Sequence, residues 1–173
     1  MALEIEIKLP LADSEIVENS LNNSAKFIYE EHQVDYYFTP AHRNFIEDKS
    51  SIKEWFRLRT VDGNSSVNYK DYSAFTHCTE YETKISSVDD MLNILKSLNF
   101  KNIITVDKVR KSWLLNDIEI SFDDVKELVS FIELEYKGDI DNVDEIRKYL
   151  FSMLDGINAS VGEEDKKGYP WLL

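Results

Sequence analysis

The amino-acid sequence predicts an α+β fold, in which an eight-stranded antiparallel β-barrel has helices packed on its outside. Two observations support this prediction. About eight short segments alternate between apolar and polar residues, and three longer segments carry apolar residues at helical spacing. The chain has 173 residues, of which 43% are hydrophobic, so it can bury a sizeable core. Its length fits a single domain covering residues 1–173.

The predicted strands are bounded by residues that favour turns. Pro10 ends the first strand and Pro40 stops the second, because proline has no backbone N–H to donate to a ladder. The segment Asp62-Gly63-Asn64-Ser65 is typical of a hairpin turn, and Asn116-Asp117 indicates a second hairpin. We therefore expect strands over residues 3–9, 27–38, 54–61, 66–72, 78–85, 100–114, 118–122 and 129–137.

Three amphipathic segments predict helices, over residues 13–24, 87–98 and 141–154. Ser87 precedes the apolar stripe of the second segment and is a suitable N-cap. Gly156 follows the third segment, where glycine commonly serves as a C-terminal cap. The apolar stripe of each helix needs cover, which the apolar faces of the strands can supply.

Composition excludes several classes of protein. The chain carries 33 acidic and 20 basic side chains, a net charge of −13, which argues against nucleic acid or anionic lipid as a partner. Cys78 is the only cysteine, so the sequence contains no disulfide framework and suits the reducing cytoplasm. No apolar run reaches the roughly 18 residues of a membrane span. The three histidines show no metal-site spacing, and neither a P-loop nor a Gly-x-Gly-x-x-Gly motif occurs.

The polar positions of the predicted strands are almost all charged, and charges of one sign recur two residues apart. Successive strand side chains point to opposite faces, so each such set shares one face. The sets are Glu4, Glu6 and Lys8; Arg57 and Arg59; Lys108 and Arg110; Glu119, Ser121 and Asp123; and Glu133 and Glu135.

A sheet covered by helices outside and lined by charge inside would be a polar tunnel. An ordinary half-solvated sheet is the alternative. A barrel whose core is only ion pairs would have to bury about a dozen charges without a ligand, which is costly. Paired carboxylates suit Mg²⁺ or Mn²⁺, and arginine and lysine suit phosphate, so the combination favours a metal-bound polyphosphate.

The order of these motifs resembles the CYTH superfamily, the triphosphate tunnel metalloenzymes. The motif Glu4-Ile5-Glu6-Ile7-Lys8 is similar to the Glu-x-Glu-x-Lys signature of that superfamily. The resemblance covers nearly the whole chain, and the segment from Phe122 to Glu135 looks most like the class IV adenylyl cyclase branch. Members of that branch usually carry glycine where this chain has Glu127, Leu128 and Val129.

The resemblance implies roles for individual residues. It implies that Lys8 is catalytic and lies near the reacting phosphate, where a lowered pKa would let it orient or deprotonate a nucleophile. The implied ligands of Mg²⁺ or Mn²⁺ are Glu4, Glu6, Glu133, Glu135 and Asp123. The implied triphosphate-binding residues are Arg57, Arg59, Lys70, Lys108 and Arg110. Glu80 and Glu82 are weaker assignments with a salt-bridge role as the alternative, and Asp35 and Tyr37 are expected to be architectural.

The resemblance implies a small triphosphate as the substrate: ATP, inorganic triphosphate or thiamine triphosphate. The function that the resemblance favours is that of an adenylyl cyclase, which converts ATP to cyclic AMP and pyrophosphate. The alternatives are a triphosphatase that releases orthophosphate and a non-catalytic module that binds polyphosphate or nucleotide. The aromatic C-terminus and the apolar sheet faces leave room for a homodimer.

Overall fold

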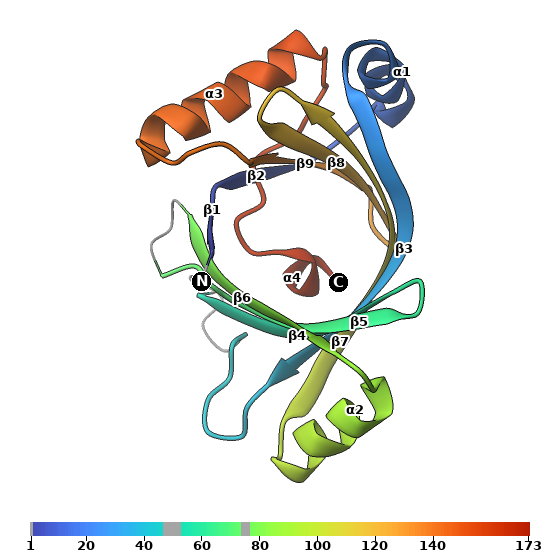
Figure 1. Cartoon of the computed structure of the whole chain (residues 1–173), viewed down its shortest axis with the longest axis vertical. Helices are drawn as coiled ribbons and strands as arrows, with labels where there is room; N and C mark the ends of the chain where they lie inside the picture. Colours follow the sequence, from blue (N-terminus) through green and yellow to red (C-terminus); the bar gives the residue numbers. More distant parts are fainter. Residues whose placement is uncertain (1, 47–52, 74–76) are drawn as a thin grey trace. The chain divides into compact units, whose positions relative to one another are not determined.

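The computed structural model describes residues 2–46, 53–73 and 77–173. The strands of this part of the chain are β1 (Ala2–Glu4), β2 (Glu6–Pro10), β3 (Lys26–Thr39), β4 (Glu54–Val61), β5 (Asn64–Asp71), β6 (Cys78–Ile85), β7 (Lys101–Leu115), β8 (Ile118–Val125) and β9 (Ser130–Tyr136) (Figure 1). The helices are α1 (Ser14–Ser24), α2 (Val88–Ser97), α3 (Val143–Gly156) and α4 (Tyr169–Leu172).

The predicted fold class is confirmed: the chain is α+β, and its sheet is built from antiparallel pairs. Over the described residues the strand order is β1-β6-β5-β4-β3-β7-β8-β9-β2. The eight predicted strands are all present, and the first is divided into β1 and β2 at Ile5, which gives nine within the described ranges. The short helix α4, which begins beside Pro170, was not predicted.

One predicted helix end is wrong. Gly156 is the last residue of α3 rather than the residue beyond it, and Ile157 is the C-cap. The left-handed backbone that ends the helix falls on Asn158, with φ of 56°, since asparagine also adopts this conformation. The predicted N-cap of α2 is confirmed, because the Ser87 hydroxyl accepts a hydrogen bond from the Asp90 N–H.

The turns explain how neighbouring strands pair. Asp62 and Gly63 both have positive φ, 45° and 83°, as a two-residue hairpin turn requires, and they join β4 to β5. Asn116 has φ of 53° in the turn between β7 and β8. Glu127, with φ of 73°, adopts the left-handed conformation between β8 and β9. This is the segment in which the resembling branch carries glycine.

The chain divides into two compact units. Unit 1 contains Met1–Leu3, His32–Asp107 and Lys167–Leu173, and unit 2 contains Glu4–Glu31 and Lys108–Lys166. In unit 2, α1 and α3 lie against one side of the strands (Figure 1). Their residues Val17, Leu21 and Leu150 pack with Ile120 and Leu134 of the strands in one buried apolar cluster.

Unit 1 has its own apolar layer. Leu95 of α2 packs with Phe38 and Leu58 of the strands, and Phe56 and Phe100 lie at the edge of this cluster. The Phe56 and Phe100 rings lie 5.6 Å apart in a tilted contact. In unit 2 the helices α1 and α3, and in unit 1 the helix α2, therefore cover the apolar face of the strands, and the charged residues occupy the opposite face.

Among the described residues, no helix is long and apolar enough to cross a membrane.

Candidate functional site

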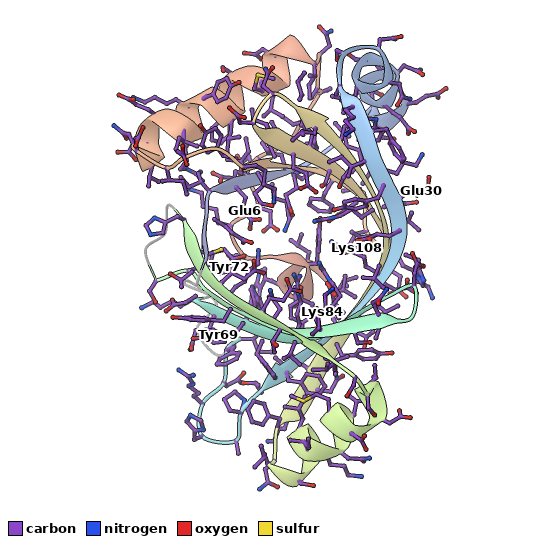
Figure 2. All side chains as sticks on the ribbon, viewed as in Figure 1. Glu6, Glu30, Tyr69, Tyr72, Lys84 and Lys108 are labelled. Carbon is purple, nitrogen blue, oxygen red and sulfur yellow. The ribbon has the colours of Figure 1, made fainter. Side chains whose placement is uncertain are left out.

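The strand register of unit 2 brings its charged residues together in cross-strand rows. Lys8 of β2 is opposite Glu133 of β9. Glu6 is opposite Glu135, which in turn is opposite Glu119 of β8. All of these residues lie on the face away from the apolar cluster, and Figure 2 shows Glu6 and Lys108 on the side of the strands that α3 does not cover.

The buried carboxylate of Asp123 binds the basic side chains of this face. It is 1% exposed, and its carboxylate accepts two hydrogen bonds from Arg110, at 2.6 and 2.7 Å. Lys108 donates a third at 2.6 Å. Burial opposes the charged carboxylate, but Arg110 and Lys108 outweigh it and lower the pKa of Asp123. Asp123 thus holds two cations in defined positions.

Lys8 lies in an acidic environment. Its Nζ is 3.0 Å from Glu133 Oε2, and Arg110 Nη2 approaches the same oxygen at 3.1 Å. Burial disfavours the ammonium, but the carboxylates of Glu133, Glu6 and Asp123 raise the pKa of Lys8 above its ordinary value. The lowered pKa expected from the sequence is therefore wrong for this arrangement, because acids surround the amine.

Three carboxylates form a row across adjacent strands: Glu6, Glu135 and Glu119, which we call the carboxylate row. Directly opposed residues on antiparallel strands have Cβ atoms about 4.5–5.5 Å apart, so like charges there repel. Burial raises the pKa of Glu135 to about 7; Lys137 counteracts this shift, and Glu4 and Glu133 add to it. Crowded carboxylates of this kind match the hard oxygen ligands of Mg²⁺ and Mn²⁺.

The acids named from the sequence are partly paired with bases. Across the described ranges, no group of three or more His, Cys, Asp or Glu residues is spaced to hold a metal ion as it stands. Glu133 contacts Lys8 and Arg110, Glu135 contacts Lys137 at 2.7 Å, and Asp123 accepts from Arg110 and Lys108. The donor chemistry fits a divalent cation, and these side chains would have to exchange base partners for it.

Unit 1 contains a second anchored pair of cations. Asp35 of β3 is fully buried and accepts two hydrogen bonds from Arg59, at 2.7 and 2.8 Å. Arg57 Nη1 donates to Asp35 and to the Tyr37 hydroxyl, both at 3.3 Å. Within the described part of the chain, Arg57 Nε is buried without a hydrogen-bond partner. Asp35 and Tyr37 position Arg57, which agrees with the architectural role expected of them.

The remaining predicted residues of unit 1 lie further along the same face. Lys70 Nζ is 3.9 Å from Glu80 Oε1, and Asn68 also donates to Glu80. Glu82 accepts from the Ser66 hydroxyl at 2.7 Å and its side chain is exposed. Glu80 thus contacts a base, as the alternative salt-bridge assignment expects, and Glu82 has a hydrogen bond at an exposed position.

Sequence reasoning did not count Glu119, Tyr29 and Lys137 as site residues. The Tyr29 hydroxyl donates to Glu119 Oε1 at 2.9 Å, and Lys137 Nζ contacts Glu119 Oε2 at 3.4 Å. Glu119 could have been found, because the Asn116-Asp117 hairpin and the alternation of β8 place it on the charged face. Tyr29 is 90 residues from Glu119 in the chain, so no local pattern could connect them.

The chain is similar in sequence and in fold to several known proteins. The model of the CYTH domain family matches residues 2–169. A protein of Methanocaldococcus jannaschii named "Putative adenylate cyclase MJ0240" is 34% identical over 96% of each chain. The Pyrococcus horikoshii protein PH1819 is 26% identical and superposes with a TM-score of 0.82, covering 98% of this chain and 97% of the other. A Hippeastrum protein, HpAC1, described as having a dominant triphosphatase activity, is 12% identical with a TM-score of 0.62, covering 96% and 93% of the two chains.

Proposed function

Because the chain belongs to the CYTH domain family, we propose that it is a metal-dependent enzyme that acts on a triphosphate, and that this triphosphate is ATP. The observation that carries the proposal is the pair of buried aspartates. Asp35 orients Arg57 and Arg59, and Asp123 orients Arg110 and Lys108. Cations held in place before the ligand arrives lose little conformational freedom when they bind phosphate.

The phosphate-binding role is proposed for the cations of both units, each considered on its own. In unit 1 these are Arg57, Arg59 and Lys70, and Arg57 retains hydrogen-bonding capacity beyond Asp35 and Tyr37. In unit 2 they are Lys108 and Arg110. A guanidinium can donate in parallel to two phosphate oxygens, whereas an ammonium acts as a point charge, so the arginines would supply orientation.

The carboxylate row is the proposed location of the divalent cation. Glu6 and Glu135 would be its main ligands, with Glu4 and Glu133 beside them. A bound Mg²⁺ or Mn²⁺ would withdraw charge from the phosphate oxygens and neutralise the developing charge. Asp123 was also expected to be a ligand; its contacts to Arg110 and Lys108 favour a positioning role instead.

The proposed reaction is intramolecular. The ribose 3′ oxygen attacks the α-phosphorus, a new P–O bond closes the ring, and the bond from the α-phosphorus to the β-phosphate oxygen breaks. The products are cyclic AMP, pyrophosphate and the proton lost by the hydroxyl. Lys8 carries a charge, since its pKa is raised, so it would stabilise the phosphate oxygens electrostatically rather than remove that proton. The name of the 34% identical relative, "Putative adenylate cyclase MJ0240", supports the cyclase reaction over others.

A triphosphatase is the second candidate, and the activity described for the Hippeastrum protein supports it. In this reaction water attacks the terminal phosphorus and orthophosphate leaves. The same cations would serve both reactions, because each needs charge stabilisation around a phosphate chain. The two reactions differ in which phosphorus lies beside the nucleophile.

A product assay separates these candidates. The purified protein is incubated with Mg²⁺ or Mn²⁺ and, separately, with ATP, inorganic triphosphate and thiamine triphosphate. We expect cyclic AMP and pyrophosphate in equal amounts from ATP. If the protein releases orthophosphate from inorganic triphosphate and forms no cyclic AMP from ATP, it is a triphosphatase and not a cyclase. Binding of triphosphates without any product would contradict both reactions.

A further inference from the structure

Lys137 occupies an unusual position beside the carboxylate row. It directly follows β9, two residues after Glu135, and its backbone N–H donates to Asp117 O at 2.7 Å. Its Nζ lies 2.7 Å from Glu135 Oε2 and 3.4 Å from Glu119 Oε2. One ammonium therefore contacts two carboxylates that face each other across adjacent strands.

The surrounding contacts show that this ammonium balances the row. Glu119 and Glu135 are directly opposed, so their charges would otherwise repel. Tyr29 donates to the other oxygen of Glu119, at 2.9 Å, and holds that carboxylate in place. The Lys137 side chain is 40% exposed, whereas those of Glu119 and Glu135 are only 19% and 20% exposed. The cation thus approaches the row from its solvent side.

We propose that Lys137 is a built-in counter-cation of the carboxylate row, and that a divalent cation must displace it from Glu135 in order to bind. This inference rests on the proposed metal role of the row. A carboxylate oxygen in contact with an ammonium is less available to a metal ion, and an adjacent positive charge repels the ion as it binds. Lys137 is accordingly a positioning residue that reduces metal affinity and stabilises the row while the metal is absent.

If Lys137 competes with the metal, replacing it should improve metal binding even though an ion pair is lost. In the Lys137→Met variant the apolar stem remains and the charge is lost. We expect its Mn²⁺ affinity, measured by isothermal titration or by the electron paramagnetic resonance signal of free Mn²⁺, to increase about tenfold. A purely structural lysine would give unchanged or weaker binding when replaced.

Two control variants separate local competition from a general charge effect. Lys126→Met removes one exposed positive charge from the same unit, in the turn after β8, and should change Mn²⁺ affinity by less than about twofold, since exposed charges are well screened. Lys137→Arg keeps the charge beside Glu135 and should retain the affinity of the wild type. Circular dichroism of each variant verifies that it folds.

Each outcome of the titration has a defined meaning. Tighter Mn²⁺ binding by Lys137→Met than by Lys126→Met supports the proposal, including the case in which the wild type binds too weakly to measure. Equal or weaker binding by Lys137→Met overturns it. The test does not depend on catalysis, so wild-type protein that binds Mn²⁺ but forms no product would contradict the proposed reaction and leave the competition with Lys137 to be judged by affinity alone.

Discussion

Arg110 and Asp123 form a two-point ion pair, with Nε 2.6 Å from Oδ1 and Nη2 2.7 Å from Oδ2. The two residues face each other across β7 and β8. Because the carboxylate is buried and also accepts from Lys108, it fixes the direction of the guanidinium rather than merely balancing its charge. Five predictions follow from this pair, from other contacts of the structure and from the backbone conformation of Glu127.

Asp123→Asn should destabilise the protein by about 3–5 kcal/mol, because it leaves buried cations without their carboxylate. Chemical denaturation at pH 7 measures this difference. Lys111→Met, which breaks a partly exposed pair with Glu18, is the matched control and should cost less than about 1 kcal/mol. Equal losses in the two variants would contradict the anchoring role of Asp123.

The same pair predicts how stability depends on pH. The pKa of Asp123 is lowered below its ordinary value of 3.8 in the folded protein, so its contribution is fully present above pH 3.8 and is lost as the pH falls through the folded pKa. The stability difference between wild type and Asp123→Asn should thus stay constant from pH 7 to about pH 5 and shrink only in stronger acid. A difference that shrinks already between pH 7 and 5 would assign the effect to another group.

Substitution of Lys8 should mainly change kcat, whereas substitution of Arg57 should mainly change KM. Lys8→Met should lower kcat by about 100-fold or more with little change in KM, since the proposed contact forms with the reacting phosphate. Arg57→Met should mainly raise KM for ATP, because it binds phosphate before and during the reaction alike. Steady-state kinetics with saturating Mg²⁺ separates the two, and an identical pattern for both variants would remove the distinction between these roles.

The carboxylate row should determine metal dependence. Treatment with a chelator should abolish product formation, and Mg²⁺ or Mn²⁺ should restore it. Glu6→Gln should raise the metal concentration needed for half-maximal activity by about tenfold or more, because it removes one charged ligand. Glu30→Gln is the control, since Glu30 is exposed on β3 and projects away from the row (Figure 2). An equal effect of both changes would contradict the proposed ligands.

Glu127→Gly should stabilise the protein. Glu127 has φ of 73°, a conformation that costs a residue with a Cβ atom about 1–2 kcal/mol and costs glycine almost nothing. Glycine also gives the unfolded chain more freedom, so we expect a net gain of about 1 kcal/mol. Thermal unfolding should show a rise of about 2–4 °C in Tm. Glu127→Ala keeps the strain and should show no such rise.

Much of the charged face could be predicted from local patterns. The alternation of Glu4-Ile5-Glu6-Ile7-Lys8 places both glutamates and the lysine on one side of a strand, because the period of two is a property of the extended backbone itself. Turn residues such as Asp62 and Gly63 determine the pairing of β4 with β5 for the same local reason. The α+β class and the assignment of charges to faces are thus contained in the amino-acid sequence.

The tertiary structure alone decided which charges meet. Lys8 has a raised pKa because the pairing of β2 with β9 brings Glu133 within 3.0 Å, although 125 residues separate them in the sequence. Likewise, Tyr29 reaches Glu119 across 90 residues of the chain, and Lys137 reaches it through the pairing of β8 with β9. Electrostatic interactions depend on the distance between charges and on their burial, and a single strand determines neither. For this reason the sequence determined which residues form the charged faces, and folding determined their partners and protonation.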